Sequence, residues 1–460
     1  MSQSLENSKV FCVNPFIQAM LTAQGSMKPC SLFTGHVTDG SQELSVYETP
    51  VEDIWNSEHL RRVRRQMIAG DKVSECSSCY LMESRGEISG RIAANQSWGA
   101  ALWGNPRNQS VGELAESALA GEGAMRSGPS WLYLEFGNLC NLRCRSCNSR
   151  YSKSIAKDRV HRRWENADEQ PPFGLRGVGT ADNSTEIRLR GSEVSSYSRL
   201  APGKEWSQDR EFILHELLRD AHNITKLQIG GGEPVMAPDT AWLLETIVSK
   251  GLSSSINLHF VTNGTKYDQK IADLIGCFDE FAIALSVDGF SLLNEYIRKG
   301  SRWRAVSDNV VKYCSAFPQS VYIKTTVQAY NMLHLVDLAN YANSMGIRLQ
   351  CHFLNNPRYL SCFQMPAKAR KAAATKLRQY TSETLYPEVT SVSKENASEL
   401  LKIAQVLEEA AGDLDPRTIA DFINFTSDLD ASRGQDILQL NAELVEFIGE
   451  AGVPWEPERP

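Results

Sequence analysis

The sequence predicts an α/β fold in which a parallel sheet is covered by helices. Short strand-like runs alternate with longer segments of helical spacing over residues 131–353. Strand, helix and strand in succession indicate parallel strands joined by crossovers, so the sheet is either doubly wound or barrel-like. A cysteine-rich region precedes this alternation, and a region of helical spacing follows it.

Six runs are predicted as strands: Trp131–Phe136, Lys226–Ile229, Asn257–Val261, Glu280–Ser286, Val321–Val327 and Arg348–Phe353. Helical spacing recurs between several of them, for example over 242–248 and 335–341. After Pro366 the chain is predicted to be helical. There Leu400, Ile403 and Leu407 share one helical face, and Ser398 is the expected cap near the helix start.

Four regions follow from this pattern: residues 1–100 hold the first four cysteines, 101–129 form a linker rich in small residues, 130–360 carry the sheet, and 361–460 form a helical C-terminal region. Residues 156–210 are predicted to be an insertion between the first two strands. They are long, polar and rich in Arg, Gly and Ser, and loops of that length are commonly functional or mobile.

Composition narrows the class of protein. Apolar residues make up 42% and charged residues 22%, as in an ordinary globular protein, and the net charge of -7 argues against a nucleic-acid binder. The polar N-terminus and the absence of a long apolar run predict no signal peptide and no membrane span, hence a cytoplasmic location. In that compartment, clustered cysteines indicate metal binding or catalysis more often than disulfides.

Cys140, Cys144 and Cys147 lie within eight residues, directly after the first predicted strand. Three thiolates on one loop can hold three irons of a cubane iron–sulfur cluster, which leaves the fourth iron open to another ligand. A structural zinc site completed by a distant Cys or His remains an alternative.

Three further segments stand at the ends of predicted strands or close behind them, where ligands of parallel sheets bind. Gly230-Gly-Gly-Glu-Pro234 could hold a cationic amino group with its backbone and its carboxylate, Ser286-Val-Asp-Gly289 could bind a ribose, and Arg298 could pair with a carboxylate. Taken alone, each segment is more simply an ordinary turn or a solvated arginine.

Together and in this order, the cysteine triplet, Gly-Gly-Glu-Pro and Ser-Val-Asp-Gly resemble the radical S-adenosylmethionine (radical SAM) superfamily over roughly residues 130–360. The resemblance implies a partial (β/α)6 TIM-like barrel and a [4Fe–4S] cluster held by Cys140, Cys144 and Cys147, with SAM on the open iron. It implies that Gly231, Gly232 and Glu233 contact the SAM amino group. It also implies that Ser286 and Asp288 lie near the ribose and Arg298 near the carboxylate. Ser146 departs from the aromatic residue usual before the third cysteine.

Cys12, Cys30, Cys76 and Cys79 resemble the SPASM/twitch auxiliary-cluster modules of the same superfamily, here placed before the barrel. Four cysteines suffice for one fully ligated cluster but not for two, so a twitch-like module with a second [4Fe–4S] cluster is expected. A four-cysteine zinc site is the alternative.

The resemblance implies an enzyme that cleaves SAM to a 5′-deoxyadenosyl radical and abstracts a substrate hydrogen. Its expected substrate is a peptide or protein, and its expected reductant a protein such as flavodoxin or ferredoxin. The alternatives are a small-molecule substrate, such as a sugar or nucleoside, and a non-catalytic zinc scaffold.

Two other features have simpler interpretations. The basic run from Arg143 to Arg163 is predicted to be a solvated face, and Asp430 with Arg433 a surface ion pair.

Overall fold

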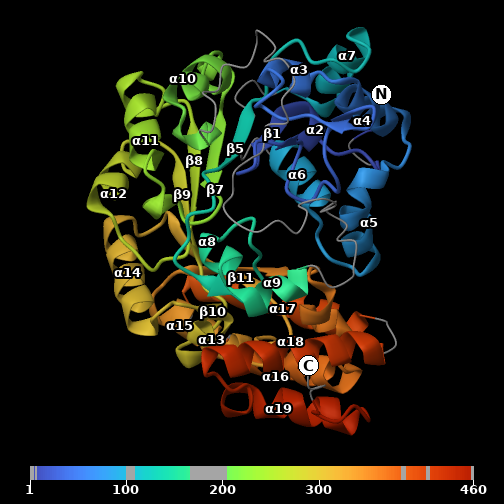
Figure 1. The fold of residues 1–460 in the computed structure, drawn as a ribbon, viewed down its shortest axis with the longest axis vertical. Helices are drawn as coiled ribbons and strands as arrows, with labels where there is room; N and C mark the ends of the chain where they lie inside the picture. Colours follow the sequence, from blue (N-terminus) through green and yellow to red (C-terminus); the bar gives the residue numbers. More distant parts are fainter. Residues whose placement is uncertain are drawn as a thin grey trace. The chain divides into compact units, whose positions relative to one another are not determined.

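The computed structural model describes residues 5, 8–99, 109–165, 205–384, 390–410 and 415–456. The chain forms two compact units. The first comprises Met1–Asn138, Glu169–Phe260 and Gln269–Phe281, and the second Leu139–Asp168, Val261–Asp268 and Ala282–Pro460. Most of the predicted insertion lies outside the described residues. Figure 1 shows the ribbon, coloured along the sequence.

In the first unit the strands follow the order β8-β7-β5-β1-β2. Their bounds are β1 Gln18–Leu21, β2 Met27–Lys28, β5 Trp131–Glu135, β7 Lys226–Gly230 and β8 Asn257–Thr262. All neighbours are parallel except β2, which runs antiparallel to β1. The predicted parallel pairing is confirmed in this unit, and apolar side chains of its strands such as Leu132, Leu227 and Leu258 are buried.

The N-terminal region contributes a strand to this sheet. β1 pairs with β5 in parallel, with Gln18 opposite Trp131 and Leu21 opposite Leu134. The segment predicted as a linker contains helix α7 (Val111–Ala120), where Ser110 and Glu113 form a reciprocal capping box. The domain boundaries drawn from the sequence stay predictions.

Helices and short elements complete the first unit. They are α2 Asn14–Ile17, α3 Val51–Trp55, α4 Glu58–Ala69, α5 Ser77–Ser84, α6 Gly90–Gly99, α10 Arg210–Phe212, α11 Thr240–Ser249, α12 Gln269–Ile275, the single turns η1 Ser74–Cys76, η2 Trp206–Gln208, η3 Ile213–Leu217, η4 Ala221–Asn223 and η5 Pro234–Met236, and the hairpin strands β3 Thr38–Asp39 and β4 Gln42–Glu43. Helix α4 shows both usual end signals: the Ser57 hydroxyl accepts from Leu60 N–H, and Gly70 ends the helix with φ +85°. Helices α11 and α12 lie side by side (Figure 1).

In the second unit the parallel strands follow the order β12-β11-β9. Their bounds are β9 Phe281–Ser286, β11 Val321–Val327 and β12 Arg348–Phe353, and a separate antiparallel pair is formed by β6 Arg143–Cys144 and β10 Arg298–Lys299. The helices are α8 Lys153–Ala156, α9 Arg159–Glu165, α13 Leu292–Ile297, α14 Trp303–Ala316 and α15 Leu335–Ser344, with the short turns η6 Arg358–Leu360 and η7 Cys362–Gln364. Along β11, burial alternates residue by residue, as a sheet with two different faces requires.

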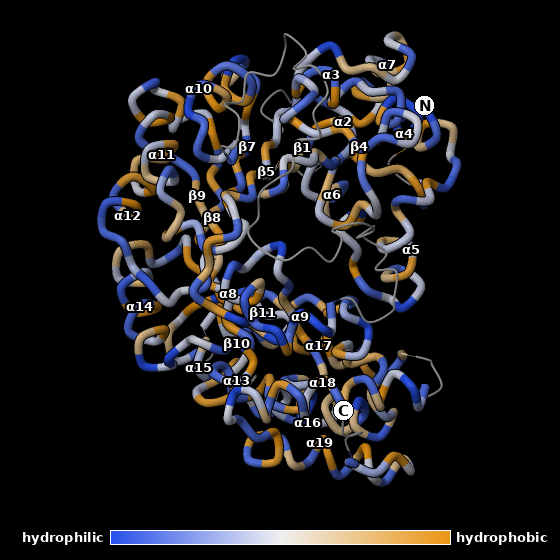
Figure 2. The backbone as a smooth tube through the Cα atoms, viewed as in Figure 1, coloured by the Kyte–Doolittle hydropathy of each residue, from blue (hydrophilic) through white to orange (hydrophobic). Residues whose placement is uncertain are grey.

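Four helices form the C-terminal part of the second unit: α16 Ala367–Thr384, α17 Ser391–Glu409, α18 Pro416–Arg433 and α19 Leu438–Glu450. Leu400, Ile403 and Leu407 are buried on α17, as predicted. The cap predicted at Ser398 is wrong. Helix α17 begins earlier, where the Thr390 side chain accepts from Ser393 N–H, so Ser398 lies within the helix. Figure 2 shows hydrophilic and hydrophobic residues interspersed along these helices, as one-sided burial requires.

The prediction of an α/β fold with a mainly parallel sheet and a helical C-terminal region is confirmed, and each of the six predicted strands forms within a residue or so of its expected bounds. Within the described residues the strand order is that of an open sheet, without a pairing that closes a barrel. None of the described helices is long and apolar enough to cross a membrane.

Candidate metal centres

The loop of Cys140, Cys144 and Cys147 lies in the second unit, and hydrogen bonds to its backbone fix its conformation. Cys144 belongs to strand β6 and pairs with Arg298 of β10. Cys147 N–H donates to the Cys144 carbonyl at 3.1 Å, and the hydroxyl of Ser154 donates to the Cys140 carbonyl at 2.8 Å. The three cysteines are therefore held on one short, hydrogen-bonded turn.

The three thiols interact electrostatically. Burial raises the pKa of the Cys144 thiol to about 12, with Arg298 opposing the rise and Cys140 adding to it. Burial also raises the pKa of Cys147, and the thiolates of Cys144 and Cys140 raise it further. Since cluster ligands bind as thiolates, iron has to supply the compensating positive charge. The donor set fits a cluster held by three cysteines.

Cys140 has a polar neighbour that the motif analysis missed. Asn263 Nδ2 lies 3.8 Å from Cys140 Sγ and donates to Asn141 Oδ1 at 3.1 Å. Thr265 joins the same network, because Asn141 Nδ2 donates to its hydroxyl at 3.0 Å. The available signal was the turn Asn263-Gly-Thr265 just after the third predicted strand, where polar residues of a parallel sheet commonly meet a ligand.

Asp288 and Arg298 form an ion pair in the same unit. Arg298 Nε lies 2.8 Å from Asp288 Oδ2, and the Asp288 side chain is only 1% exposed. Asp288 Oδ1 also accepts from Thr326 N–H at 2.9 Å. The pKa of Arg298 is raised because Asp288 and the nearby cysteines outweigh the cost of its burial. Ser286 ends β9 and lies opposite Lys324 of β11. Contacts of these side chains with the ribose or carboxylate of SAM stay predictions.

Gly231, Gly232 and Glu233 lie in the first unit, after β7. Gly231 has φ +110°, and a Cβ there would stand 2.8 Å from Phe136 N, so this position accepts only glycine without strain. Gly232 N–H donates to the Gly137 carbonyl at 3.0 Å. Glu233 is buried, and its carboxylate accepts from Val235 N–H at 3.1 Å, which starts the turn η5. A contact of this turn with the SAM amino group stays a prediction.

The N-terminal cysteines converge within the first unit. Cys12 precedes α2, Cys30 follows β2, Cys76 ends η1 and Cys79 lies in α5. Burial raises the pKa of Cys12, and the charges of Cys30, Cys76 and Cys79 raise it further. Burial together with the charge of Cys79 raises the pKa of Cys30 to about 12. Four thiols within electrostatic reach of one another fit one fully ligated iron–sulfur cluster in donor chemistry.

Helix α6 holds the backbone on both sides of Cys12. The Phe11 carbonyl accepts from Asn95 Nδ2 at 2.9 Å and from Arg91 Nη1 at 3.0 Å. Val13 N–H donates to Asn95 Oδ1 at 2.9 Å. The amide of Asn95 thus bridges the residues before and after the cysteine.

Among the residues that the structure describes, no group of His, Cys, Asp or Glu side chains has the geometry of a single-ion metal site. None of the eleven cysteines, which all lie in described parts of the chain, forms a disulfide. Of the four cysteines outside the two sets, Cys362 is buried and Cys277 exposed.

Two predictions about charged residues are wrong. Asp430 and Arg433 do not form a surface pair: Asp430 pairs with Arg145, and Arg433 with Asp158 at 3.1 Å. Arg145 was expected on a solvated face, but its side chain is completely buried. Local spacing misled in both cases, because the true partners are distant in sequence and meet only in the folded unit.

One set of three thiols on a single loop and a second set of four thiols in the N-terminal region are typical of an iron–sulfur protein. Sequence comparison agrees. Residues 134–342 match the radical SAM superfamily, and residues 12–80 match SPASM, an iron–sulfur cluster-binding domain. Residues 134–342 are thus a radical SAM superfamily domain, and residues 12–80 are a SPASM-type auxiliary-cluster region. Its cofactors are accordingly a [4Fe–4S] cluster, SAM and an auxiliary iron–sulfur cluster.

Solved structures resemble parts of the chain. "Native anSMEcpe with bound AdoMet" is 18% identical, with 55% of this chain and 60% of that chain covered and a TM-score of 0.37. SuiB of Streptococcus suis bound to S-adenosylmethionine is 14% identical, with 73% of this chain and 70% of that chain covered and a TM-score of 0.37. SuiB bound to precursor peptide SuiA is 13% identical, with 70% of this chain and 63% of that chain covered and a TM-score of 0.36. Thus the chain spans less than two thirds of anSMEcpe. A search of the curated proteins finds no match.

Proposed function

We propose that this chain is a radical SAM enzyme that acts on a peptide or protein. When bound at Cys140, Cys144 and Cys147, the [4Fe–4S] cluster would supply the electron that cleaves SAM to methionine and a 5′-deoxyadenosyl radical, which abstracts a substrate hydrogen. The observation that carries the proposal is the single turn that holds three interacting thiols, with Arg298 paired in register beside Cys144.

The chain's own residues have separable tasks in this proposal. The thiols of the turn bind iron, and Arg298 places a positive charge against the negative charge of Cys144. Asp288 fixes the Arg298 side chain through the 2.8 Å ion pair, so that the charge stays beside the strand pair. Gly231 allows the turn after β7 to approach the backbone of residues 135–137 closely.

The auxiliary cluster is proposed at Cys12, Cys30, Cys76 and Cys79, where it would relay electrons or stabilise the region. The resemblance to radical SAM enzymes with SPASM modules supports a peptide or protein substrate. A reductant such as flavodoxin or ferredoxin and a cytoplasmic location are proposed as well. Cluster ligands bind as thiolates, and a compartment that keeps thiols reduced suits them.

The decisive experiment is Cys144→Ala in anaerobically reconstituted protein with dithionite and SAM. We expect 5′-deoxyadenosine to form with the wild type and with Cys277→Ala, the matched control at an exposed cysteine, but not with Cys144→Ala. Undiminished 5′-deoxyadenosine from the Cys144 variant would refute the assignment. One equivalent of zinc at each site, without SAM turnover, would favour the scaffold alternative.

The substrate class is tested separately. If a short reading frame for a precursor peptide lies beside this gene, its peptide is co-expressed with the enzyme and analysed by mass spectrometry. We expect a mass change that depends on Cys144. An unchanged peptide together with normal SAM cleavage would exclude that peptide and favour a small-molecule substrate.

A further inference from the structure

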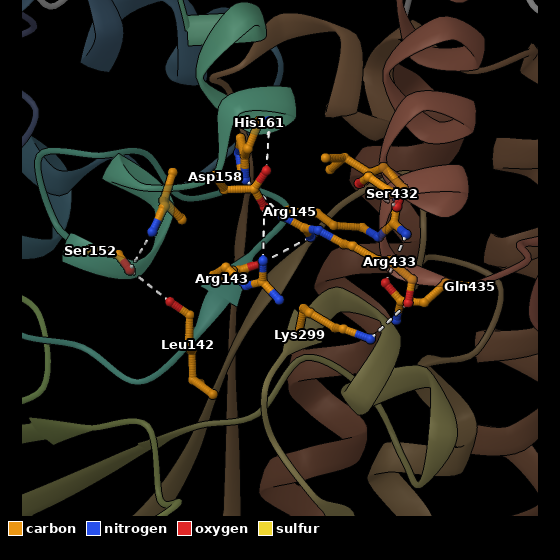
Figure 3. A network of polar contacts seen from close by, with 12 residues as sticks. Leu142, Arg143, Arg145, Ser152, Asp158, His161, Lys299, Ser432, Arg433 and Gln435 are labelled. Atoms are coloured by element: carbon orange, nitrogen blue, oxygen red, sulfur yellow. Dashed lines mark hydrogen bonds and ion pairs between the residues drawn. The ribbon is translucent and has the colours of Figure 1, made fainter. Parts of the chain in front are cut away.

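The last residue of α18, Arg433, reaches the cysteine loop across 290 positions of sequence. Its Nη1 donates to the Arg143 carbonyl, directly before Cys144, at 3.0 Å. Its Nη2 lies 3.1 Å from Asp158 Oδ2 and 3.0 Å from His161 Nδ1. The side chain is only 1% exposed. Figure 3 shows the network of polar contacts to which it belongs. All three partners lie between residues 143 and 161, so Nη1 and Nη2 both bind this segment.

One turn earlier on α18, Asp430 holds the other side of Cys144. Its carboxylate pairs with the guanidinium of Arg145, and it also accepts from the Tyr296 hydroxyl at 3.2 Å. The Arg145 guanidinium stands 3.7 Å from the centre of the Tyr296 ring. Arg145 N–H donates to the Ile297 carbonyl at 2.9 Å. The residues before and after Cys144 are therefore both bound by α18.

The end of α18 is itself anchored to the strand that pairs with Cys144. Lys299 Nζ donates to the Arg433 carbonyl at 3.1 Å, as suits a cation at a helix C-terminus (Figure 3). Asp430 Oδ2 accepts from Ile437 N–H at 2.9 Å, which fixes the turn into α19. Two elements of the same unit, β10 and α18, thus enclose the loop.

Arg433 also acts through its charge. Its Nη1 lies 3.0 Å from the carbonyl directly before Cys144, so its cation stands close to a ligand residue, and a nearby cation stabilises a negative sulfur. The same electrostatics favours the reduced, more negative form of a cluster bound through that sulfur. Charge near a cluster is one of the variables that set its reduction potential.

We propose that Arg433 and Asp430 are positioning residues for the cysteine loop. Asp430 fixes the loop geometry through Arg145, and Arg433 both fixes the Arg143 carbonyl and raises the reduction potential of the cluster at Cys140, Cys144 and Cys147. This inference rests on the proposed function, because it concerns the cluster assigned there.

The test is an anaerobic redox titration of the whole reconstituted chain. Electron paramagnetic resonance follows the cluster signal that changes when SAM is added. For Arg433→Met we expect a more negative midpoint potential at unchanged iron content. For Arg433→Lys we expect a potential close to the wild type, because the charge remains. Arg417→Met, at the exposed start of the same helix, is the matched control and should leave the potential unchanged.

A potential that is equal in Arg433→Met and the wild type, or shifted equally by Met and Lys, would overturn the role of the charge. If Arg433→Met does not retain iron, Arg433→Gln is titrated instead and should show the same negative shift. Asp430→Asn tests the geometric role. It should lower the iron retained at this loop, and full retention with an unchanged resonance spectrum would overturn that part. A wild-type protein that binds no SAM-responsive cluster would refute the proposed function itself.

Discussion

Arg298 Nε lies 2.8 Å from Asp288 Oδ2, and the carboxylate of this pair is almost inaccessible to water. The pair connects the turn after β9 with the strand that runs beside Cys144. A buried charge whose partner is removed keeps its desolvation penalty but loses the attraction that offset it.

We therefore expect Asp288→Ala to lower the free energy of unfolding by about 3–5 kcal/mol, measured by urea denaturation of the apoprotein. Glu245→Ala is the control, because it breaks an exposed pair with Lys270 at 3.1 Å. That change should cost at most about 1 kcal/mol. Equal effects of the two substitutions would show that the Asp288 pair is not buried in solution.

Gly231→Ala tests the turn after β7. The new Cβ would meet Phe136 N at 2.8 Å, in a conformation with φ +110°. Gly251→Ala is the control, since Gly251 has φ +69° and a Cβ added there would meet no atom within 4 Å. The control should lose about 1–2 kcal/mol from its backbone conformation alone. Gly231→Ala should lose clearly more in the same urea titration, and an equal loss would mean that the turn relaxes without cost.

Asn95→Ala tests the support of the auxiliary site. Its amide accepts from Val13 N–H and donates to the Phe11 carbonyl, so its loss should free the backbone around Cys12. We expect the iron content to fall from about eight to about four per chain while SAM cleavage chemistry at the other loop persists. Gln96→Ala, exposed on the same helix, is the control. Unchanged iron in Asn95→Ala would contradict the supporting role.

Glu87 predicts a dependence of stability on pH. Burial raises the pKa of its carboxyl from 4.5 to about 7, and Arg85, 3.7 Å away, opposes this only in part. Between these values the unfolded chain has released a proton that the folded protein retains, so stability falls as the pH rises through that window. Glu87→Gln should be more stable than the wild type at about pH 8, by up to about 3 kcal/mol, and equal to it at about pH 4.

Urea midpoints at several pH values check this expectation. Glu116→Gln, an exposed glutamate of α7, should follow the wild type throughout. A constant difference between Glu87→Gln and the wild type across the range would rule out titration of Glu87 as its cause.

The strands could be predicted because a strand with one buried face has apolar residues at every second position, and a strand with two buried faces has a short apolar run. Val321, Ile323 and Val327 of β11 are buried while their neighbours are not, and this pattern was readable without a structure. The cysteine sets were equally readable, because thiols are uncommon and their spacing is local.

The surroundings of the cysteines could not be predicted in the same way. Arg145 finds Asp430 across 285 positions, and nothing near either residue indicates the other. The i,i+3 spacing of Asp430 and Arg433 favoured a local ion pair. Instead, Asp430 pairs with the buried Arg145, and Arg433 pairs with the buried carboxylate of Asp158. Ser398 failed as a cap because a helix start depends on where the chain leaves the previous element, and α17 starts after Thr390.

The parallel pairing of β1 with β5 has a consequence for how this chain can be shortened. A protein that began after residue 130 would lack more than a cysteine region, because β5 would become an edge strand with unpaired amides and carbonyls. Such edges recruit other chains and lead to aggregation. The N-terminal region is thus a built-in cover for the sheet, and its removal should be judged by solubility before any loss of chemistry is assigned to a missing cluster.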